Sequence, residues 1–245
     1  MMPLENAIAE HLGKVTLSSP DLHGSIPLFG NTTHSLSKSQ VDYLLLQVGI
    51  TDGYLVCSEQ SKSSAHLWVE AAAKIGALIT TLTGHDGIFY NIGGGIGIES
   101  LAFSKLSGGK SVSVDIHPHP FSVGRKYAKD LRANVNYVKG DALELVSVQD
   151  VKPDDVVAFI FPTRSIADYW KRFLDRGCAI VIANEVDRLN DDYLPGTIFR
   201  RNNADKFTRR FEERFFKKSG YRVQSYSIPY HPSFLLVVAQ RTGSR

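Results

Sequence analysis

Three glycines at alternating positions form the most distinctive short pattern in this sequence. Gly93, Gly95 and Gly97 lie in the segment from Tyr90 to Glu99, directly after a strand-like run and directly before a helix-like run. Glycine lets the backbone turn sharply and approach a bound molecule closely, and the first turn of the following helix offers N–H groups that lack intrahelical partners. The pattern predicts a cradle for a nucleotide-like ligand.

Two acidic residues follow the next two strand-like runs. Asp115 lies twenty residues after Gly95, at the end of the run SVSVD, and Asp141 lies shortly after the run at 135–138. A carboxylate at a strand end can accept hydrogen bonds from both hydroxyls of a ribose. Since open α/β sheets bind ligands at the carboxyl ends of their strands, we expect both acids beside the glycine turn.

The spacing of the glycines argues against one class of nucleotide site. A dinucleotide fingerprint requires the pattern G-x-G-x-x-G, but the sixth position is Ile98 when counted from Gly93 and Ser100 when counted from Gly95. The alternating glycines instead resemble the first motif of class I S-adenosylmethionine (SAM)-dependent methyltransferases, where they make room for the methionine part of the cofactor. The resemblance is close from about Gly87 to Ala183 and looser in the C-terminal helix and hairpin.

The resemblance implies SAM as the cofactor and assigns a part of it to each motif. The three glycines are expected to face its methionine end, Asp115 its ribose, and Asp141 with Ala142 its adenine. The implied cofactor site consists of Asn91, Gly93, Gly95, Gly97, Asp115, Ile116, Asp141, Ala142 and Phe161.

One position departs from the family pattern. The acid that usually opens the glycine motif is Asn91 in this chain, and an amide offers less to the charged end of methionine. This departure leaves open a second function, that of a non-catalytic SAM- or nucleoside-binding protein with a degraded site. The string Ile-Gly-Gly-Gly also resembles spermidine synthases, but the place of their acidic loop reads Phe161 to Ser165 here, without an acid, so aminopropyl transfer is a minor alternative.

The residues that would carry a catalytic step are less well defined. In methyl transfer the cofactor supplies the electrophile, so the protein aligns the acceptor and, where needed, removes a proton. Three residues near the expected strand ends are weak candidates for a catalytic role, namely His117, Glu185 and His231. The segment after the fourth strand lacks the metal ligands of catechol-type O-methyltransferases, and we expect no metal site.

Strand-like and helix-like runs alternate regularly through the middle of the chain. Strands are expected at 87–92, 111–116, 135–138, 156–161 and 179–183, with helices at 98–106, 123–132 and 166–174. The tail adds a charged helix at 206–218 and two strands at 221–228 and 233–240. The predicted fold is α/β: a Rossmann-like three-layer sandwich with a seven-stranded, mostly parallel sheet and an antiparallel C-terminal hairpin.

The first 82 residues lie outside this alternation. Residues 1–40 are rich in Ser, Pro, Gly, Thr and His and predict an irregular arm, while helices are expected at 37–50 and 61–82. We expect residues 1–82 to form an N-terminal helical extension that caps the substrate site. Residues 83–245 are expected to form the SAM-binding domain.

The composition is typical of a globular intracellular protein. Of 245 residues, 43% are hydrophobic and 22% charged, the formal net charge is +3, and the two cysteines lie far apart. The sequence shows no secretory signal pattern and no run of about 18 apolar residues, which predicts a cytoplasmic protein without a membrane partner.

The strongest local charge is the basic stretch from Arg200 to Lys218. Its cations could contact nucleic-acid phosphates, but three acidic residues interrupt it, and Phe207, Phe211 and Phe215 recur every fourth residue as a core-facing stripe. A solvated helix packed on the sheet is favoured over a nucleic-acid surface, and a small-molecule acceptor is slightly favoured over RNA. The identity of the acceptor and the oligomeric state stay open.

Overall fold

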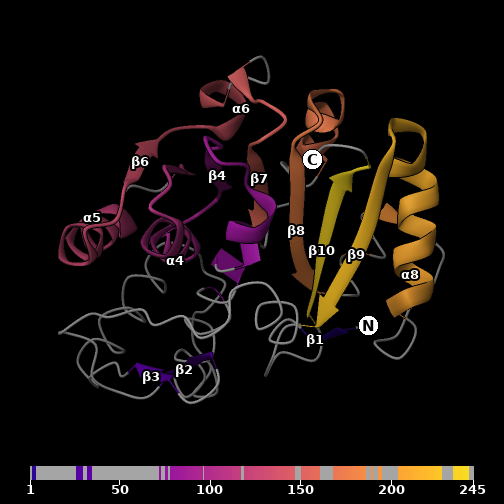
Figure 1. Cartoon of the computed structure of the whole chain (residues 1–245). Coiled ribbons are helices and arrows are strands. Elements are labelled where there is room, and N and C mark those ends of the chain that lie inside the picture. Colours follow the sequence, from indigo (N-terminus) through magenta and orange to yellow (C-terminus); the bar gives the residue numbers. More distant parts are fainter. Residues whose placement is uncertain are drawn as a thin grey trace.

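A sheet with the strand order β1-β9-β10-β8-β7-β4-β5-β6 runs through the centre of the molecule. The computed structural model describes residues 2–3, 26–29, 32–34, 72, 75–76, 78–95, 97–116, 119–146, 150–160, 168–185, 189, 193–194, 204–227 and 234–242. The strands, in sheet order, are β1 (Met2–Pro3), β9 (Tyr221–Ser227), β10 (Phe234–Arg241), β8 (Ala179–Glu185), β7 (Val156–Ile160), β4 (Phe89–Ile92), β5 (Ser111–Asp115) and β6 (Val135–Lys139). Figure 1 shows the sheet between its helices.

The strand directions bring the predicted site residues to one end of the sheet. β4, β5, β6, β7 and β8 are parallel to one another, whereas β10 is antiparallel to both β8 and β9. The carboxyl ends of β4, β5 and β6 therefore lie side by side at one edge, which is where ligands bind in open α/β sheets. Order and directions confirm the predicted Rossmann-like sheet with its antiparallel hairpin.

The sequence of β7 explains its central position. All five residues of Val156–Ile160 are apolar and buried, as expected for a parallel strand covered on both faces. In β4 and β5 the two faces differ: Ile92 and Val114 join the large core, whereas Asn91 and Ser113 are buried polar residues at the alternate positions. One face of the sheet therefore carries two buried polar side chains at paired positions of β4 and β5.

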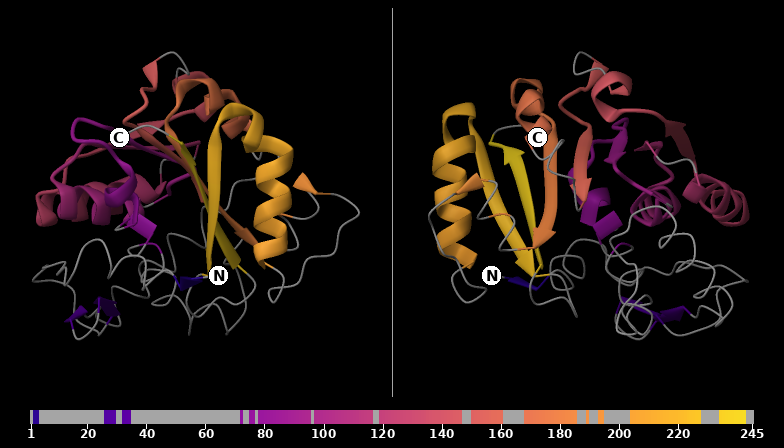
Figure 2. Two further views of the ribbon diagram at one scale, coloured as in Figure 1. Left: turned by 45° about the vertical axis from the view of Figure 1, so that its right-hand side comes forward. Right: turned by 180° about the vertical axis from the view of Figure 1, so that it is seen from behind.

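Helices cover both faces of the sheet (Figure 2). α4 (Ile98–Ser107) and α5 (His119–Leu131) lie on the face of Asn91 and Ser113, where Leu101, Phe121 and Tyr137 form a small core. The opposite face is covered by the 3-10 helix η2 (Tyr169–Arg176) and by α8 (Ala204–Phe211). A short helix, α6 (Ala142–Leu145), follows β6.

The C-terminal helix changes its geometry where the sequence predicts one continuous α-helix. α8 is followed by the π-helical turn η4 (Glu212–Phe216) and the 3-10 turn η5 (Lys217–Ser219). The wider π turn shifts the residue that reaches the core by one position. Phe216 is fully buried and stacks on Trp170 with ring centroids 4.8 Å apart, whereas Phe215 is only partly buried. The predicted stripe is thus buried at Phe207 and Phe211, whereas its third member, Phe215, packs against the core but is only partly buried.

The expected helix at 166–174 also differs from the observed one. The described part of this segment is a 3-10 helix that runs on to Arg176 and ends at Gly177, whose φ of 76° is left-handed. The helix is amphipathic, with Tyr169, Trp170 and Phe173 buried against the sheet.

The described residues of the N-terminal region contain strands that the sequence did not predict. β1 pairs with β9 in parallel, and β2 (Ile26–Phe29) pairs with β3 (Thr32–His34) in antiparallel fashion. The described residues within 72–82 are helical, with Ile75, Leu78 and Ile79 buried, in agreement with the second predicted helix. The helix expected at 37–50 lies outside the described residues.

Candidate functional site

The glycine turn directly follows β4 and crosses the end of β5. The backbone N–H groups of Gly93 and Gly94 both donate to the carbonyl oxygen of Val114, at 2.8 and 3.2 Å. Gly93, Gly95 and Gly97 have φ values of 71°, 53° and 76°, a left-handed region that favours glycine. Three residues in this region within five positions explain why the sequence alternates glycine here.

The outer side of the turn is open at two of the glycines. A Cβ atom at Gly93 or Gly95 would meet no atom within 4 Å. A Cβ atom at Gly97 would lie 3.1 Å from the ring of Tyr137, and one at Gly94 would overlap the hydroxyl of Ser113. Gly93 and Gly95 can therefore face a ligand, while Gly94 and Gly97 let the turn rest on the sheet and on the start of α4.

Asp115 is brought onto the turn by a direct contact. Its Oδ2 accepts a hydrogen bond from the backbone N–H of Gly95 at 3.0 Å, and the residue is half-buried at the end of β5. The structure thus brings together the second glycine and the first acid of the predicted pattern.

The next strand end lies beside Asp115. The backbone N–H of Gly140 donates to the carbonyl oxygen of Asp115 at 3.0 Å, so the loop that carries Asp141 starts next to β5. Asp141 is exposed and immediately precedes α6, and Ala142 is buried. The backbone carbonyl oxygen of Asp141 accepts a hydrogen bond from the N–H of Glu144 at 3.0 Å, and this bond begins α6. The three strand ends therefore form one continuous rim.

An apolar side chain stands exposed on this rim. Ile116 follows Asp115 and exposes 58% of its surface. Among the described residues, it is the large hydrophobic side chain that is exposed to solvent. A single exposed isoleucine is common on protein surfaces. Its position next to the predicted ribose acid makes it suitable for contact with a planar aromatic ligand group.

Beneath the turn lies a buried polar group in which Asn91, a member of the predicted site, is joined by three residues that the sequence did not single out. Asn91, Glu99, Ser100 and Ser113 are all buried, and Nδ2 of Asn91 donates to Oε2 of Glu99 at 3.1 Å. Burial raises the pKa of Glu99, opposed by hydrogen bonds from its own backbone N–H and from Asn91. Burial and the nearby Glu99 also raise the pKa of Tyr137, so its hydroxyl stays protonated.

The sequence contained a signal for part of this group. Ser111 and Ser113 occupy alternate positions of β5 and are both buried, so the polar face of this strand could have been predicted to lie under the glycines. No comparable signal marks Glu99, because acids in the first turn of a helix are usually solvated.

Several predicted residues lie outside the described part of the chain. These are His117, Phe161, His231 and the start of the basic stretch at Arg200 and Arg201, together with the side chain of Glu185. The backbone of Glu185 ends β8 and pairs with Phe234 of β10. A catalytic role for His117, Glu185 or His231 therefore stays a prediction.

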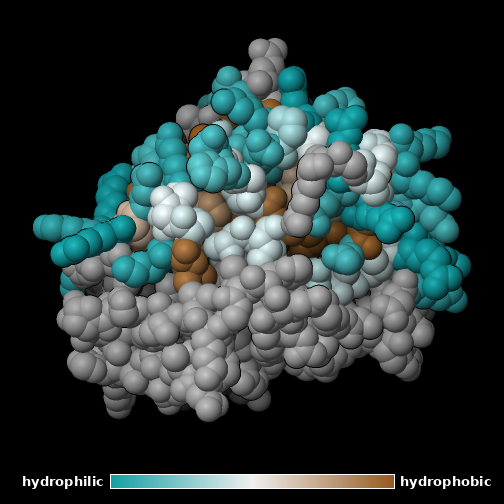
Figure 3. Space-filling view, viewed as in Figure 1, coloured by the Kyte–Doolittle hydropathy of each residue, from teal (hydrophilic) through white to brown (hydrophobic). Residues whose placement is uncertain are grey.

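The described part of the basic stretch is an exposed helix face. Arg209, Arg210, Lys217 and Lys218 are exposed, and so is the acidic Glu213 among them. Figure 3 shows hydrophilic side chains over the flank formed by α8, as well as over α5 on the other side. These mixed charges are those of a solvated helix.

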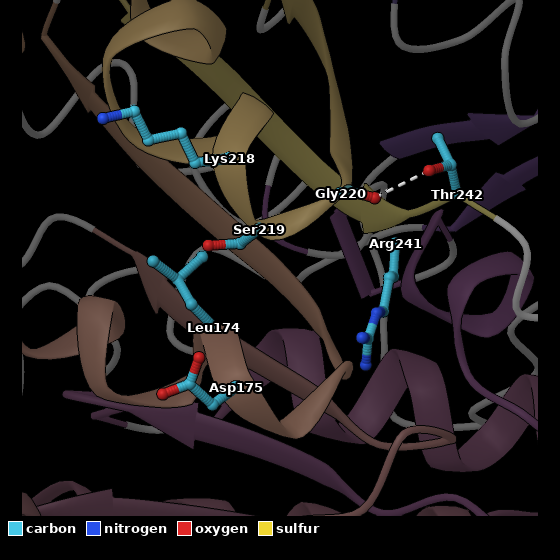
Figure 4. Close-up of a pocket in the computed structure, with 7 residues that line it drawn as sticks. All are labelled: Leu174, Asp175, Lys218, Ser219, Gly220, Arg241 and Thr242. Atoms are coloured by element: carbon cyan, nitrogen blue, oxygen red, sulfur yellow. Dashed lines mark hydrogen bonds between the residues drawn. The ribbon is translucent and has the colours of Figure 1, made fainter.

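A hollow of about 510 Å³ lies at the opposite edge of the sheet from the glycine turn. Figure 4 shows residues of η2, η5 and the end of β10 around it, with Thr242 donating to the carbonyl oxygen of Gly220 at 2.8 Å. Asp175, Lys218 and Arg241 supply charges of both signs. The hollow is thus separate from the rim formed by the strand ends.

The remaining features concern a thiol, metals and membranes. Burial raises the pKa of Cys178 to about 12, which makes it an unreactive core residue. Among the described residues, no group of three or more His, Cys, Asp or Glu side chains could hold a metal ion. In the same part of the chain, no helix has the length and apolar character needed to cross a membrane.

Comparison with solved structures shows the fold. The O-methyltransferase TomG from Streptomyces achromogenes, solved in complex with SAM, matches with a TM-score of 0.55 and 15% identity over 83% of this chain and 89% of TomG. A putative O-methyltransferase from Klebsiella pneumoniae matches with a TM-score of 0.53 and 13% identity over 82% of this chain and 89% of its own. No family model and no curated protein sequence matches. The chain has the Rossmann-like methyltransferase fold.

Proposed function

We propose that this chain is a SAM-dependent methyltransferase whose cofactor lies across the ends of β4, β5 and β6. The hydrogen bond between Gly95 and Asp115 carries the proposal, because it places an acidic side chain on an open glycine turn. The structural similarity to TomG, which was solved with SAM, supports the same cofactor. Similar folds host different activities, so the proposal depends on the site rather than on the fold.

Each part of the cofactor has residues suited to it along the rim. The open side of Gly93 and Gly95 can accept the methionine end, and the Asp115 carboxylate can accept hydrogen bonds from ribose hydroxyls. The exposed Ile116 can pack on the adenine ring, with Asp141 as an acceptor for the adenine amino group and Ala142 beside it. Phe161, directly after β7, completes the proposed site.

When bound, SAM supplies an electrophilic methyl group. The acceptor nucleophile would receive this methyl group and give up a proton. The chain has to bind and orient the two reactants and to provide a route for that proton. His117, Glu185 and His231 follow strands near the proposed site or lie in the final turn, and we propose them as candidates for the proton acceptor.

We propose further that residues 1–82 form a cap over the acceptor site and that residues 83–245 form the cofactor-binding domain. β1 pairs with Tyr226 and Ser227 at the carboxyl end of β9, so the start of the chain is attached at the same edge of the sheet as the glycine turn. A small molecule is the favoured acceptor over RNA, because the described basic helix carries acids among its cations.

The proposal is tested by binding and transfer with methyl-labelled SAM. Equilibrium dialysis measures binding, and incubation with fractions of a cell extract measures transfer of label to a product. Binding with transfer supports the methyltransferase, and binding without transfer to any fraction supports the non-catalytic alternative. No binding refutes the methyltransferase and the alternative of a SAM-binding protein.

A glycine pair provides a matched control for this experiment. Gly95→Val places a side chain in the proposed methionine position and should abolish binding. Gly108→Val introduces similar backbone strain, because Gly108 has a φ of 72°, and its side chain would also meet no neighbouring atom. Gly108 lies at the far end of α4, away from the proposed cofactor site. Unchanged SAM affinity in Gly95→Val would refute the proposed position of the cofactor.

A further inference from the structure

The two ends of the glycine turn are joined by a buried hydrogen bond. Asn91 belongs to β4, before the turn, and Glu99 to the first turn of α4, after it. Nδ2 of Asn91 donates to Oε2 of Glu99 at 3.1 Å and to Oγ of Ser100 at 3.3 Å. Asn91 is 0% exposed and Glu99 is 9% exposed. The contact ties the end of the strand to the start of the helix.

We propose that Glu99 is a positioning residue for the cofactor turn and that position 91 is an amide because position 99 is an acid. We call the two residues the Asn91–Glu99 clamp. The inference rests on the proposed function, since it concerns the shape of the SAM cradle. It replaces the interpretation of Asn91 as a sign of a degraded site.

The chemistry of the two side chains requires one donor between them. A carboxylate has acceptors only, whereas an amide has two N–H donors. With Asp at position 91, two carboxyl groups would face each other about where the 3.1 Å contact now lies, in a site closed to water. Such a pair has to share a proton or be forced apart, because like charges cannot both be held there.

The turn rests directly on this clamp. A Cβ atom at Gly94 would lie 2.9 Å from Cγ of Asn91 and would overlap Oγ of Ser113. Neither Oδ1 of Asn91 nor Oγ of Ser113 has a hydrogen-bond partner among the described residues, although both atoms are buried. A buried polar atom without a partner is costly, so the place of these two atoms beneath the turn calls for a reason. A displacement of Asn91 therefore displaces Gly94 and with it the open glycine that follows, Gly95.

The groups around Glu99 make its proton sensitive to the clamp. Tyr137 of β6 faces it, and Arg125 of α5 lies near Tyr137 and donates to the carbonyl oxygen of that residue at 3.2 Å. Glu99 is held by its own backbone N–H and by the Asn91 amide, and of these two donors the amide is the one that a substitution can change. A change at position 91 should consequently make SAM affinity depend on pH.

Four proteins test the clamp: the wild type, Asn91→Asp, Glu99→Gln and the double variant that carries both changes. SAM affinity is measured by calorimetry at pH 5.5 and pH 8. We expect Asn91→Asp to weaken binding about tenfold or more at pH 8 and much less at pH 5.5, where the acid pair holds a proton. The double variant restores one amide and one acid and should bind within about threefold of the wild type at both pH values.

Exposed positions provide the matched controls. Asn136→Asp and Glu213→Gln make the same chemical changes on the surface and should leave affinity unchanged. The clamp is overturned if Asn91→Asp binds SAM as tightly as the wild type at pH 8. It is also overturned if the double variant binds no better than Asn91→Asp.

Thermal unfolding without ligand separates this inference from the proposed function. If the wild type binds no SAM, the proposed function fails, and the four melting temperatures decide the clamp alone. A melting temperature lowered by Asn91→Asp and recovered in the double variant upholds the pairing. Additive changes in melting temperature overturn it.

Discussion

The backbone N–H of Gly95 donates a hydrogen bond to Oδ2 of Asp115 at 3.0 Å, across two neighbouring strand ends. The contact links the residues whose spacing predicted the site. It also orients the carboxylate, because one of its oxygen atoms is held by the turn. The Asp115 side chain is therefore positioned before any ligand arrives, which reduces the cost of ordering it on binding.

Asp115→Asn should weaken SAM binding about 10- to 100-fold, because the amide keeps one acceptor but loses the charge that strengthens its hydrogen bonds to ribose hydroxyls. Equilibrium dialysis with labelled SAM measures the effect. Asp168→Asn serves as the control, since Asp168 is an exposed acid paired with Lys171 on the surface. An affinity equal to that of the wild type would remove Asp115 from the site.

Ile116→Ser should separate binding from stability. The side chain is 58% exposed, so its loss should change the free energy of unfolding by about 0.5 kcal/mol or less. Burial of this side chain against adenine would be lost, which should weaken SAM binding by about 1 kcal/mol, or roughly fivefold. Urea unfolding and calorimetry on the same samples compare the two. Equal affinity of variant and wild type would show that adenine does not contact Ile116.

The alternation of strands and helices predicted the sheet because burial repeats with a fixed period along each element. β7 carries a different signal, because a short run of apolar residues without polar ones is typical of a strand covered on both faces. The spacing from Gly95 to Asp115 likewise predicted their meeting, because parallel strands bring their carboxyl ends to one edge. Local pattern and global topology agree at these positions.

The polar layer under the turn could not be predicted in the same way. The burial of Glu99 depends on α4 packing against neighbours such as Gly76, where even a Cβ atom would collide with the carbonyl oxygen of Glu99. Such tertiary contacts leave no periodic trace in the sequence. Buried polar residues such as Glu99 were therefore found only from the structure.

The buried carboxyl of Glu99 should make stability depend on pH. Burial raises its pKa in the folded state above the ordinary value of 4.5, so the folded chain holds the proton more tightly than the unfolded chain. The resulting stabilisation is complete below about pH 4.5 and is lost as pH rises toward the folded pKa, by at most about 1.4 kcal/mol per pH unit.

The measurement compares the wild type with Glu99→Gln, which mimics the protonated acid. Urea unfolding at pH 5 and pH 8 should show the wild type losing stability relative to the variant as pH rises. Tyr137 does not contribute over this range, because its pKa is raised from 10.0. A stability difference between the two proteins that is the same at both pH values would contradict the raised pKa.

The sequence predicted Phe215 as a core-facing residue, but the π turn after α8 buries its neighbour Phe216 more deeply. Phe216 is 0% exposed and stacks on Trp170. Phe215 is partly buried, and its ring lies 5.0 Å from the ammonium group of Lys171 and near the guanidinium of Arg214. Phe216→Ala should cost about 3–5 kcal/mol by leaving a cavity. Phe215→Ala should cost less, about 1–2 kcal/mol, because solvent and the cations can fill the space. Urea unfolding of both variants checks the order: a larger loss for Phe215→Ala would mean that a regular α-helix continues through Phe216 and that the predicted stripe holds.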